Sequence, residues 1–177
     1  MCQRPGTLQK VGQPWSLLDS VLCIGLASIL LACSSDRHES FYPSLAEAVT
    51  DGAITRGWIP DFMPLSSRDI HEVDEISPSK EWCAFEFLTT DSQGLRKNLQ
   101  SVDALEPSVR RVSNPGVSWW PDVLMGNLDV EKIHGAGFEL YLVVAHDTPS
   151  TTELLLFAIN WANGHGFFYS TRRVVQP

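Results

Sequence analysis

Hydrophobic residues are most concentrated in the last third of the chain, in residues 137–147 and 153–173. Both stretches are rich in β-branched and aromatic residues, which is typical of strands that are buried on at least one face. Between Trp161 and Phe167 lies the segment ANGHG, residues 162–166, which has the composition of a hairpin turn. A hairpin turn needs such glycines for positive φ angles, so the turn explains them better than a ligand loop does. The pattern predicts a β core in this region.

A second strand pattern lies in residues 81–88, EWCAFEFL. Cys83, Phe85 and Phe87 alternate with Glu86, which predicts a half-buried strand. Cys83 is expected to be buried as a small hydrophobe. A reactive thiolate needs a positive, partly open setting, and the neighbouring Glu81 and Glu86 argue against one.

Two other segments have helical features. Leu45, Ala48 and Val49 recur at helical spacing, with Gly52 as a stop signal, and predict a short amphipathic helix. Residues 91–105 predict a second helix, which a glycine weakens.

Residues 65–78 combine signals for a third helical turn with a signal that ends it. Ser66 and Asp69 form a capping-box-like pair, and Leu65 and Ile70 are spaced as a hydrophobic staple. We therefore expect one or two helical turns from Ser66 or Ser67, followed by extended chain.

The segment between the first helix and this turn, GWIPDFMP, is predicted to be an extended connector. Pro60 and Pro64 fix their own φ angles and favour extended conformations in the residues before them. Trp58 and Phe62 would then cover one end of the core as rigid apolar side chains.

Together these elements predict an α+β domain with about four or five mostly antiparallel strands and two or three short helices packed on one side. The chain has 177 residues, 44% of them hydrophobic, which suits one modest domain. We assign this domain to residues 43–177, after a polar segment, residues 33–42, that we interpret as a tether.

Residues 1–32 have the organisation of a signal peptide. Arg4 and Lys10 form a sparse positive start, and residues 21–32, VLCIGLASILLA, are an uninterrupted apolar run. The run is shorter than the about 20 residues needed to cross a bilayer. Its end resembles the lipobox of bacterial lipoproteins, whose cysteine, here Cys33, is lipidated and becomes the first residue of the mature protein. A plain secretory signal cleaved nearby and an uncleaved anchor are the alternatives.

The resemblance implies a lipid-anchored protein of the bacterial cell envelope. Ser34 follows Cys33 where inner-membrane lipoproteins of enteric bacteria often have aspartate, which favours the outer membrane, facing the periplasm. The predicted partners are the membrane, through lipid on Cys33, and an envelope protein. The net charge is −8 without a basic run, so nucleic acid is excluded as a partner.

Residues 57–75, GWIPDFMPLSSRDIHEVDE, resemble a family of small bacterial proteins that carries the YbbD head domain. The residues that match its pattern are Gly57, Trp58, Ile59, Pro60, Pro64, Asp69, Ile70 and Glu72. The hairpin residues 157–170 also resemble the family's C-terminal strand pair. Asp74 replaces the family's usual histidine, so no histidine role is transferred to that position. The resemblance implies a shared fold and an envelope location, and no known activity.

The densest group of potential ligands is His71, Glu72, Asp74 and Glu75. A transition-metal site needs converging ligands with outer-shell support, and no His-Glu-x-x-His pair is present. We therefore predict no metal site, no cofactor and no catalytic residue, and interpret the group as a solvated acidic edge. The residues predicted as possible ligand or partner contacts are Trp58, Asp61, Phe62, His71, Glu72, Asp74 and Glu75.

Histidines also lie at predicted strand ends or turns, at His134, His146 and His165. A histidine beside a carboxylate, as at His146, is a possible general base. No nucleophile elbow, phosphate loop or dinucleotide motif accompanies them.

Two functions follow from the sequence. The first is a membrane-anchored, non-catalytic domain that binds an envelope component or protein, with the aromatic and acidic residues as a docking rim. The alternative is a small periplasmic hydrolase or metal-dependent enzyme that uses His71 with Glu72 or Glu75.

Overall fold

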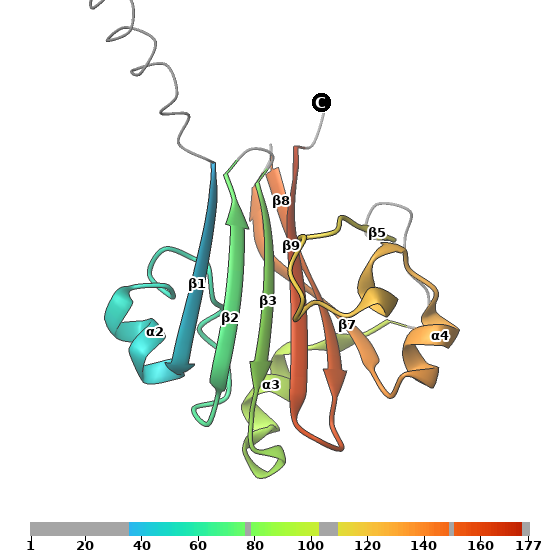
Figure 1. Ribbon diagram of the computed structural model, residues 1–177, viewed down its shortest axis with the longest axis horizontal. Coiled ribbons are helices and arrows are strands. Elements are labelled where there is room, and N and C mark those ends of the chain that lie inside the picture. Colours follow the sequence, from blue (N-terminus) through green and yellow to red (C-terminus); the bar gives the residue numbers. More distant parts are fainter. Residues whose placement is uncertain (1–35, 77–78, 103–109, 149–150, 175–177) are drawn as a thin grey trace, which may run out of the picture. The chain divides into compact units, whose positions relative to one another are not determined.

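The computed structural model describes residues 36–76, 79–102, 110–148 and 151–174 (Figure 1). The predicted signal peptide, residues 1–32, and Cys33 lie outside these residues. Among the described residues, no helix is long and apolar enough to span a membrane.

The described residues form nine strands and short helices. In chain order the elements are β1 (Arg37–Ser44), α2 (Leu45–Asp51), β2 (Arg68–Glu75), β3 (Lys80–Glu86), η1 (Thr89–Asp91), α3 (Gln93–Asn98), β4 (Gln100–Ser101), β5 (Arg111–Val112), η2 (Asp122–Leu124), β6 (Gly126–Asn127), α4 (Val130–Gly135), β7 (Glu139–Thr148), β8 (Thr151–Asn160) and β9 (His165–Val174).

Seven of the strands form one antiparallel sheet in the order β1-β2-β3-β9-β8-β7-β4. β1, β2 and β3 form one meander, and β7, β8 and β9 form a second. The two meanders meet where β3 pairs with β9. The α+β class and the antiparallel pairing are as predicted, but the sheet has more strands than the predicted four or five.

Both faces of this sheet are covered, and each cover forms its own core. The side that carries α2, α3 and residues 53–67, which we call the α2 face, buries Tyr42, Leu45, Ala48, Ala53, Ile59, Met63, Ile70, Cys83, Phe85, Phe87, Leu95, Tyr141, Leu155, Phe157, Ile159 and Phe168. The other side, which we call the α4 face, buries Val73, Trp82, Val112, Trp120, Leu124, Leu128, Ile133, Leu140, Leu156, Ala158 and Tyr169.

The two-sided cover corrects two predictions. The helices do not all pack on one side, because α4 contacts β7 and η2 on the α4 face whereas α2 packs on β1 (Figure 1). β3 is also buried on both faces, with Cys83 in one core and Trp82 in the other. The alternation in its sequence is incomplete because a central strand between two cores needs apolar residues on both sides.

The first helix is formed by local signals. Ser44 caps α2 by accepting a hydrogen bond from the backbone N–H of Glu47, and Gly52 ends it with a φ of 83°. Leu45 and Ala48 point into the core as predicted, whereas Val49 is exposed.

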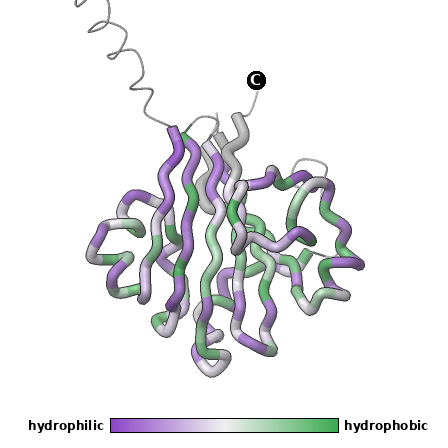
Figure 2. Tube along the Cα trace, in the orientation of Figure 1, coloured by the Kyte–Doolittle hydropathy of each residue, from purple (hydrophilic) through white to green (hydrophobic). Residues whose placement is uncertain are grey.

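Most of the predicted tether belongs to the sheet. Residues 37–42 lie in β1, the edge strand, and Tyr42 is buried. β1 and most of β2 are hydrophilic in Figure 2. An edge strand can be this polar because only part of its surface is covered and because charges protect its open edge from other strands.

The predicted helical turn at Ser66 is wrong, because residues 68–75 form strand β2. Ser66 does not cap a helix; its Oγ accepts a hydrogen bond from the backbone N–H of Leu88 at 3.1 Å. Leu65 is 87% exposed, so it makes no staple with the buried Ile70. Ile70 and Val73 lie three residues apart because each belongs to a different core, on opposite faces of the same strand.

The other predicted elements have different outcomes. The second helix is α3, which ends at Asn98 and is shorter than the predicted residues 91–105. The hairpin is confirmed, since Asn160 pairs with His165 across the turn. Of the adjacent tryptophans, Trp120 is buried and Trp119 is partly exposed.

Candidate functional site

Four acidic side chains lie on the α2 face of three long strands. Glu72 and Asp74 are on β2, Glu81 is on β3 and Glu153 is on β8. The strand register places Glu81 opposite Asp74 on one side and Ser170 on the other. The Ser170 hydroxyl donates a hydrogen bond of 3.1 Å to Glu153. Pairing therefore brings these residues together although they are up to 81 positions apart in the sequence.

Glu72 is buried without hydrogen-bond partners. It is 1% exposed, and neither carboxylate oxygen accepts a hydrogen bond within the described part of the chain. Burial raises its pKa from 4.5 to about 7, and the charge of Asp74 adds to the rise. The Ser40 hydroxyl, which is near Glu72 but outside hydrogen-bond geometry, and the Arg56 guanidinium lower the pKa, but they do not offset burial.

Glu81 is the second buried carboxyl group. It is 6% exposed, and its Oε1 has no hydrogen-bond partner among the described residues. Burial raises its pKa well above the ordinary value, and the charges of Glu72, Asp74 and Glu153 raise it further. A buried polar atom without a hydrogen-bond partner lowers stability, so Glu72 and the Oε1 atom of Glu81 are costly for the fold.

The predicted connector is part of residues 53–67, which fold as a series of turns and not as extended chain. We call residues 53–67 the connector from here on; they cover this acidic region. The Trp58 ring contacts two groups. The His38 ring lies at a centroid distance of 5.1 Å, and the Arg56 Cζ lies 3.9 Å from the Trp58 ring centroid. Arg56 also pairs with Asp51 at the end of α2, and Asp51 accepts a hydrogen bond of 2.9 Å from Tyr42. Trp58 is thus in contact with β1, through His38, and with the ion pair of Arg56 and Asp51.

The rest of the connector is fixed by burial. Ile59 and Met63 are buried in the core of the α2 face, and Phe62 packs on Phe157 at a ring distance of 5.9 Å. Phe62 therefore covers the core as predicted, whereas the ring contacts of Trp58 are with His38 and Arg56 and not with the core. Asp61 is exposed.

Two adjoining clefts separate the connector from the sheet. They have volumes of about 480 Å³ and about 220 Å³ and share Gly57, Glu81 and Glu153. The larger one is lined by Ile54, Gly57, Ile59, Pro60, Asp61, Phe62, Glu81, Asn98, Val143, Val144, Glu153 and Leu155. The smaller one is lined by Arg56, Gly57, Trp58, Asp74, Ile76, Ser79, Lys80, Glu81, Glu153 and Ser170. A largely apolar cleft with a few converging polar groups is the usual form of a small-ligand site.

The predicted contact residues divide between the two faces of the sheet. The smaller cleft is lined by Trp58 and Asp74, and the larger one by Asp61 and Phe62. Glu72 lies on the same face of β2 as Asp74. His71 lies on the α4 face, where its ring contacts those of Phe41 and Trp119. Glu75 is also on the α4 face, 3.7 Å from Arg37.

This division contradicts the enzyme sites predicted around His71. His71 and Glu72 are consecutive residues of a strand, so their side chains lie on opposite faces of the sheet. His71 and Glu75 share a face, but four residues of strand separate them by roughly 13 Å. In the ranges that the structure describes, no group of three or more histidine, cysteine or acidic residues could hold a metal ion.

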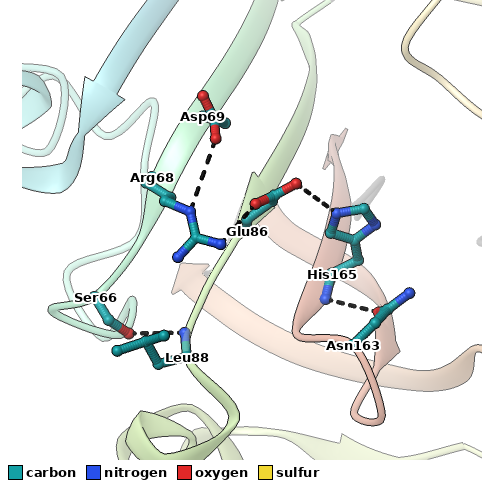
Figure 3. Close-up of polar contacts among 7 residues, drawn as sticks. All are labelled: Ser66, Arg68, Asp69, Glu86, Leu88, Asn163 and His165. Carbon is teal, nitrogen blue, oxygen red and sulfur yellow. Dashed lines mark hydrogen bonds and ion pairs between the residues drawn. The ribbon is translucent and has the colours of Figure 1, made fainter.

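At the opposite end of β3 a carboxylate is fully paired. Glu86 lies 2.9 Å from Arg68 and 2.7 Å from the Nε2 atom of His165, as Figure 3 shows. The His165 hydrogen bond and the Arg68 guanidinium lower the pKa of Glu86. His165 therefore has a structural partner at the start of β9, and Asn163 accepts a hydrogen bond from its backbone N–H.

Two other residues selected in the sequence, Cys83 and His134, lie outside the two clefts. Cys83 is buried as predicted, and burial raises the pKa of its thiol well above the usual value. His134 is exposed at the end of α4. The side chains of His146 and Asp147 lie outside the described part of the structure.

Sequence reasoning missed Glu81 and Glu153 as site residues. Glu81 precedes Cys83, Phe85 and Phe87 by even intervals, so the alternation itself places a carboxyl group on the buried face of a strand. This alternation could have identified Glu81. It could not have related Glu153 to Glu81, because that proximity depends on the pairing of β8 with β9.

The chain was compared with known families, curated proteins and solved structures. Residues 36–86 match the family model of the YbbD head domain. This confirms the resemblance based on Gly57 to Glu72. The head-domain match extends from the residue before β1 to the last residue of β3, and so includes α2, the connector and both buried carboxyl groups. It suggests an envelope-associated protein family. No curated protein and no solved structure gave a match.

Proposed function

We propose that this protein is a lipid-anchored lipoprotein of the bacterial cell envelope whose domain binds a ligand without catalysis, in the clefts beneath the connector. The head-domain match supports the envelope location. The apolar run that ends at Cys33 supports the lipid anchor and, with Ser34, an outer-membrane location facing the periplasm.

One observation carries the binding role. Glu81 lines both clefts, is 6% exposed and has an Oε1 atom without a hydrogen-bond partner in the described residues. Buried polar groups in folded proteins are normally hydrogen-bonded, and exceptions require an explanation. A ligand that supplies the missing partner explains the position of Glu81.

The binding role is tested by site-specific crosslinking in the cell envelope. A photoreactive phenylalanine analogue at position 62 places the reactive group in the larger cleft. We expect a discrete adduct from position 62 after illumination. The matched control is position 65 on the same connector, where the native Leu65 is 87% exposed and lines neither cleft.

Two results would contradict the binding role. One is the same adducts from both positions, since a surface collision and not the cleft would then produce them. The other is no adduct from position 62 at any level of expression.

The anchor has its own test. Labelling of cells with a fatty-acid probe should mark the wild-type protein, and Cys33→Ser should abolish both the label and membrane association. Persistent labelling of Cys33→Ser would place the lipid elsewhere and refute this anchor.

A further inference from the structure

We infer that the two clefts bind a primary ammonium group on an unbranched alkyl stem, with Glu81 and Glu153 receiving the ammonium group. This inference rests on the proposed binding role and names the class of ligand. The same chemical group occurs in free alkylamines and in lysine side chains.

The polar end of the site is built for a cation. Glu81 and Glu153 both line the junction of the two clefts, and Asp74 lines the smaller one beside them. An ammonium group donates three hydrogen bonds, which carboxylate oxygens accept strongly. The unpartnered Oε1 of Glu81 is an acceptor of this kind, buried at this junction.

The charged groups near Glu81 on the α2 face come from three other parts of the chain. They are Glu72 and Asp74 of β2, Glu153 of β8 and Arg56 of the connector. Lys80 also borders the smaller cleft, but it precedes Glu81 directly on β3, so alternation directs its side chain to the opposite face. Arg56 pairs with Asp51 and lies over Trp58, so Asp51 balances part of its charge. Glu72, Asp74 and Glu153 together place three carboxyl groups near Glu81, which favours a cationic ligand.

The apolar end of the site suits an alkyl stem. The larger cleft has apolar walls beside Glu81, formed by Ile59, Phe62, Val143 and Leu155. An alkyl chain can bury its methylene groups along such walls while its charged end reaches a polar group. A compact ammonium also fits between two carboxyl groups without the planar, bidentate geometry that a guanidinium requires.

A metal ion is a poorer occupant. Within the described ranges, no three acidic, histidine or cysteine side chains converge closely enough to hold one. An ammonium group needs fewer and less regular ligands, and the apolar walls would have no role in binding a bare ion.

The inference is tested by isothermal titration of the full chain in detergent with two pairs of ligands. n-Pentylamine is compared with n-pentanol, and Nα-acetyl-lysine methylamide is compared with Nα-acetyl-norleucine methylamide. We expect the amine of at least one pair to bind at least about tenfold more tightly than its neutral counterpart. Binding of n-pentylamine alone would identify a free amine as the ligand, and binding of the lysine compound would identify a side chain.

Variants identify the site of binding. Glu81→Gln should weaken amine binding at least about tenfold, because it removes the acceptor charge and keeps the shape. Glu86→Gln is the matched control, since it makes the same change on the same strand but on the opposite face, and it should leave binding unchanged. Val144→Trp is a second variant at a 54% exposed position of the larger cleft, and it should also reduce binding.

The outcomes separate this inference from the proposed function. Equal binding of amines and neutral compounds, or no binding of either amine while the adduct from position 62 persists, overturns the inference alone. Loss of both the titration signal and the adduct overturns the binding role as well. Equal weakening by Glu81→Gln and Glu86→Gln would also refute the site.

Discussion

The two ends of strand β3 carry glutamates in opposite settings. Glu86 is part of a closed network with Arg68 and His165, and its pKa is lowered (Figure 3). Glu81, five residues earlier, is almost fully buried, and its pKa is raised. The ion pairs of Glu86 are typical of a carboxylate that stabilises the fold. The burial of Glu81 costs the fold free energy, and this difference between the two glutamates supports a binding role for the clefts.

The largest effect is expected at the hairpin that brings His165 to Glu86. Gly164 has a φ of +70°, and a Cβ there would lie 2.0 Å from the carbonyl oxygen of Phe87. Gly164→Ala should therefore lower the free energy of unfolding by about 3 kcal/mol or more, measured by urea denaturation.

The matched control is Gly94→Ala in α3, where a Cβ meets no atom within 4 Å. It should leave the free energy of unfolding unchanged or raise it by up to about 1 kcal/mol. Equal losses in the two variants would show that the hairpin has no special requirement for glycine.

An intermediate effect on the free energy of unfolding is expected when Glu72 is replaced. Its folded pKa is about 7 against an ordinary value of 4.5, so the folded protein binds an additional proton between these pH values. The contribution of this group to stability is therefore present below about pH 4.5 and lost as the pH rises to about 7. Glu72→Gln cannot ionise and should be more stable than wild type at pH 8 by roughly 2 to 3 kcal/mol.

Urea denaturation at pH 5 and pH 8 measures this difference. The gap between Glu72→Gln and wild type should be much smaller at pH 5. Parallel pH profiles for the two proteins would mean that Glu72 is solvated or paired in solution.

The smallest effect on stability is expected at Glu86, and its dependence on pH is opposite to that of Glu72. A lowered pKa stabilises the folded protein above the ordinary pKa, and this contribution is lost as the pH falls through the folded pKa. The Glu86 side chain is 34% exposed, so solvent screens its ion pairs. Glu86→Gln should cost less than about 1 kcal/mol near neutral pH.

Arg68→Met is the companion variant, because it removes a partner of the same carboxylate. It should cost a similar amount, and the double variant should cost less than the two losses combined. A gain in stability for Glu86→Gln near neutral pH would remove the contrast between the two ends of β3.

The sequence predicts the parts of this fold that depend on local signals. The helix after Ser44, the turn before His165 and the burial of Cys83 follow from capping, turn chemistry and alternation. The strand at Ile70 does not, because three-residue spacing of apolar groups indicates a helix unless both faces of a sheet are covered.

The candidate site is predictable only in part, for the same reason. Trp58, Asp61 and Phe62 could be selected from one unusual segment of the sequence. The partners across the cleft, Glu81 and Glu153, come from strands whose pairing is set by long-range contacts, and no local pattern relates them. His71 attracted attention through its neighbours in sequence, but the strand geometry directs it away from them.

The pairing of β3 with β9 also has a consequence for how the chain folds. The head-domain match ends at Glu86, yet β3 is a central strand whose second neighbour begins only at His165. The ~80 residues between these strands must therefore be placed before the sheet can close. Until β9 pairs with it, β3 presents an open, apolar edge around Trp82 and Phe85 to any other strand. Incompletely folded chains should therefore be most prone to aggregate before β9 has paired with β3.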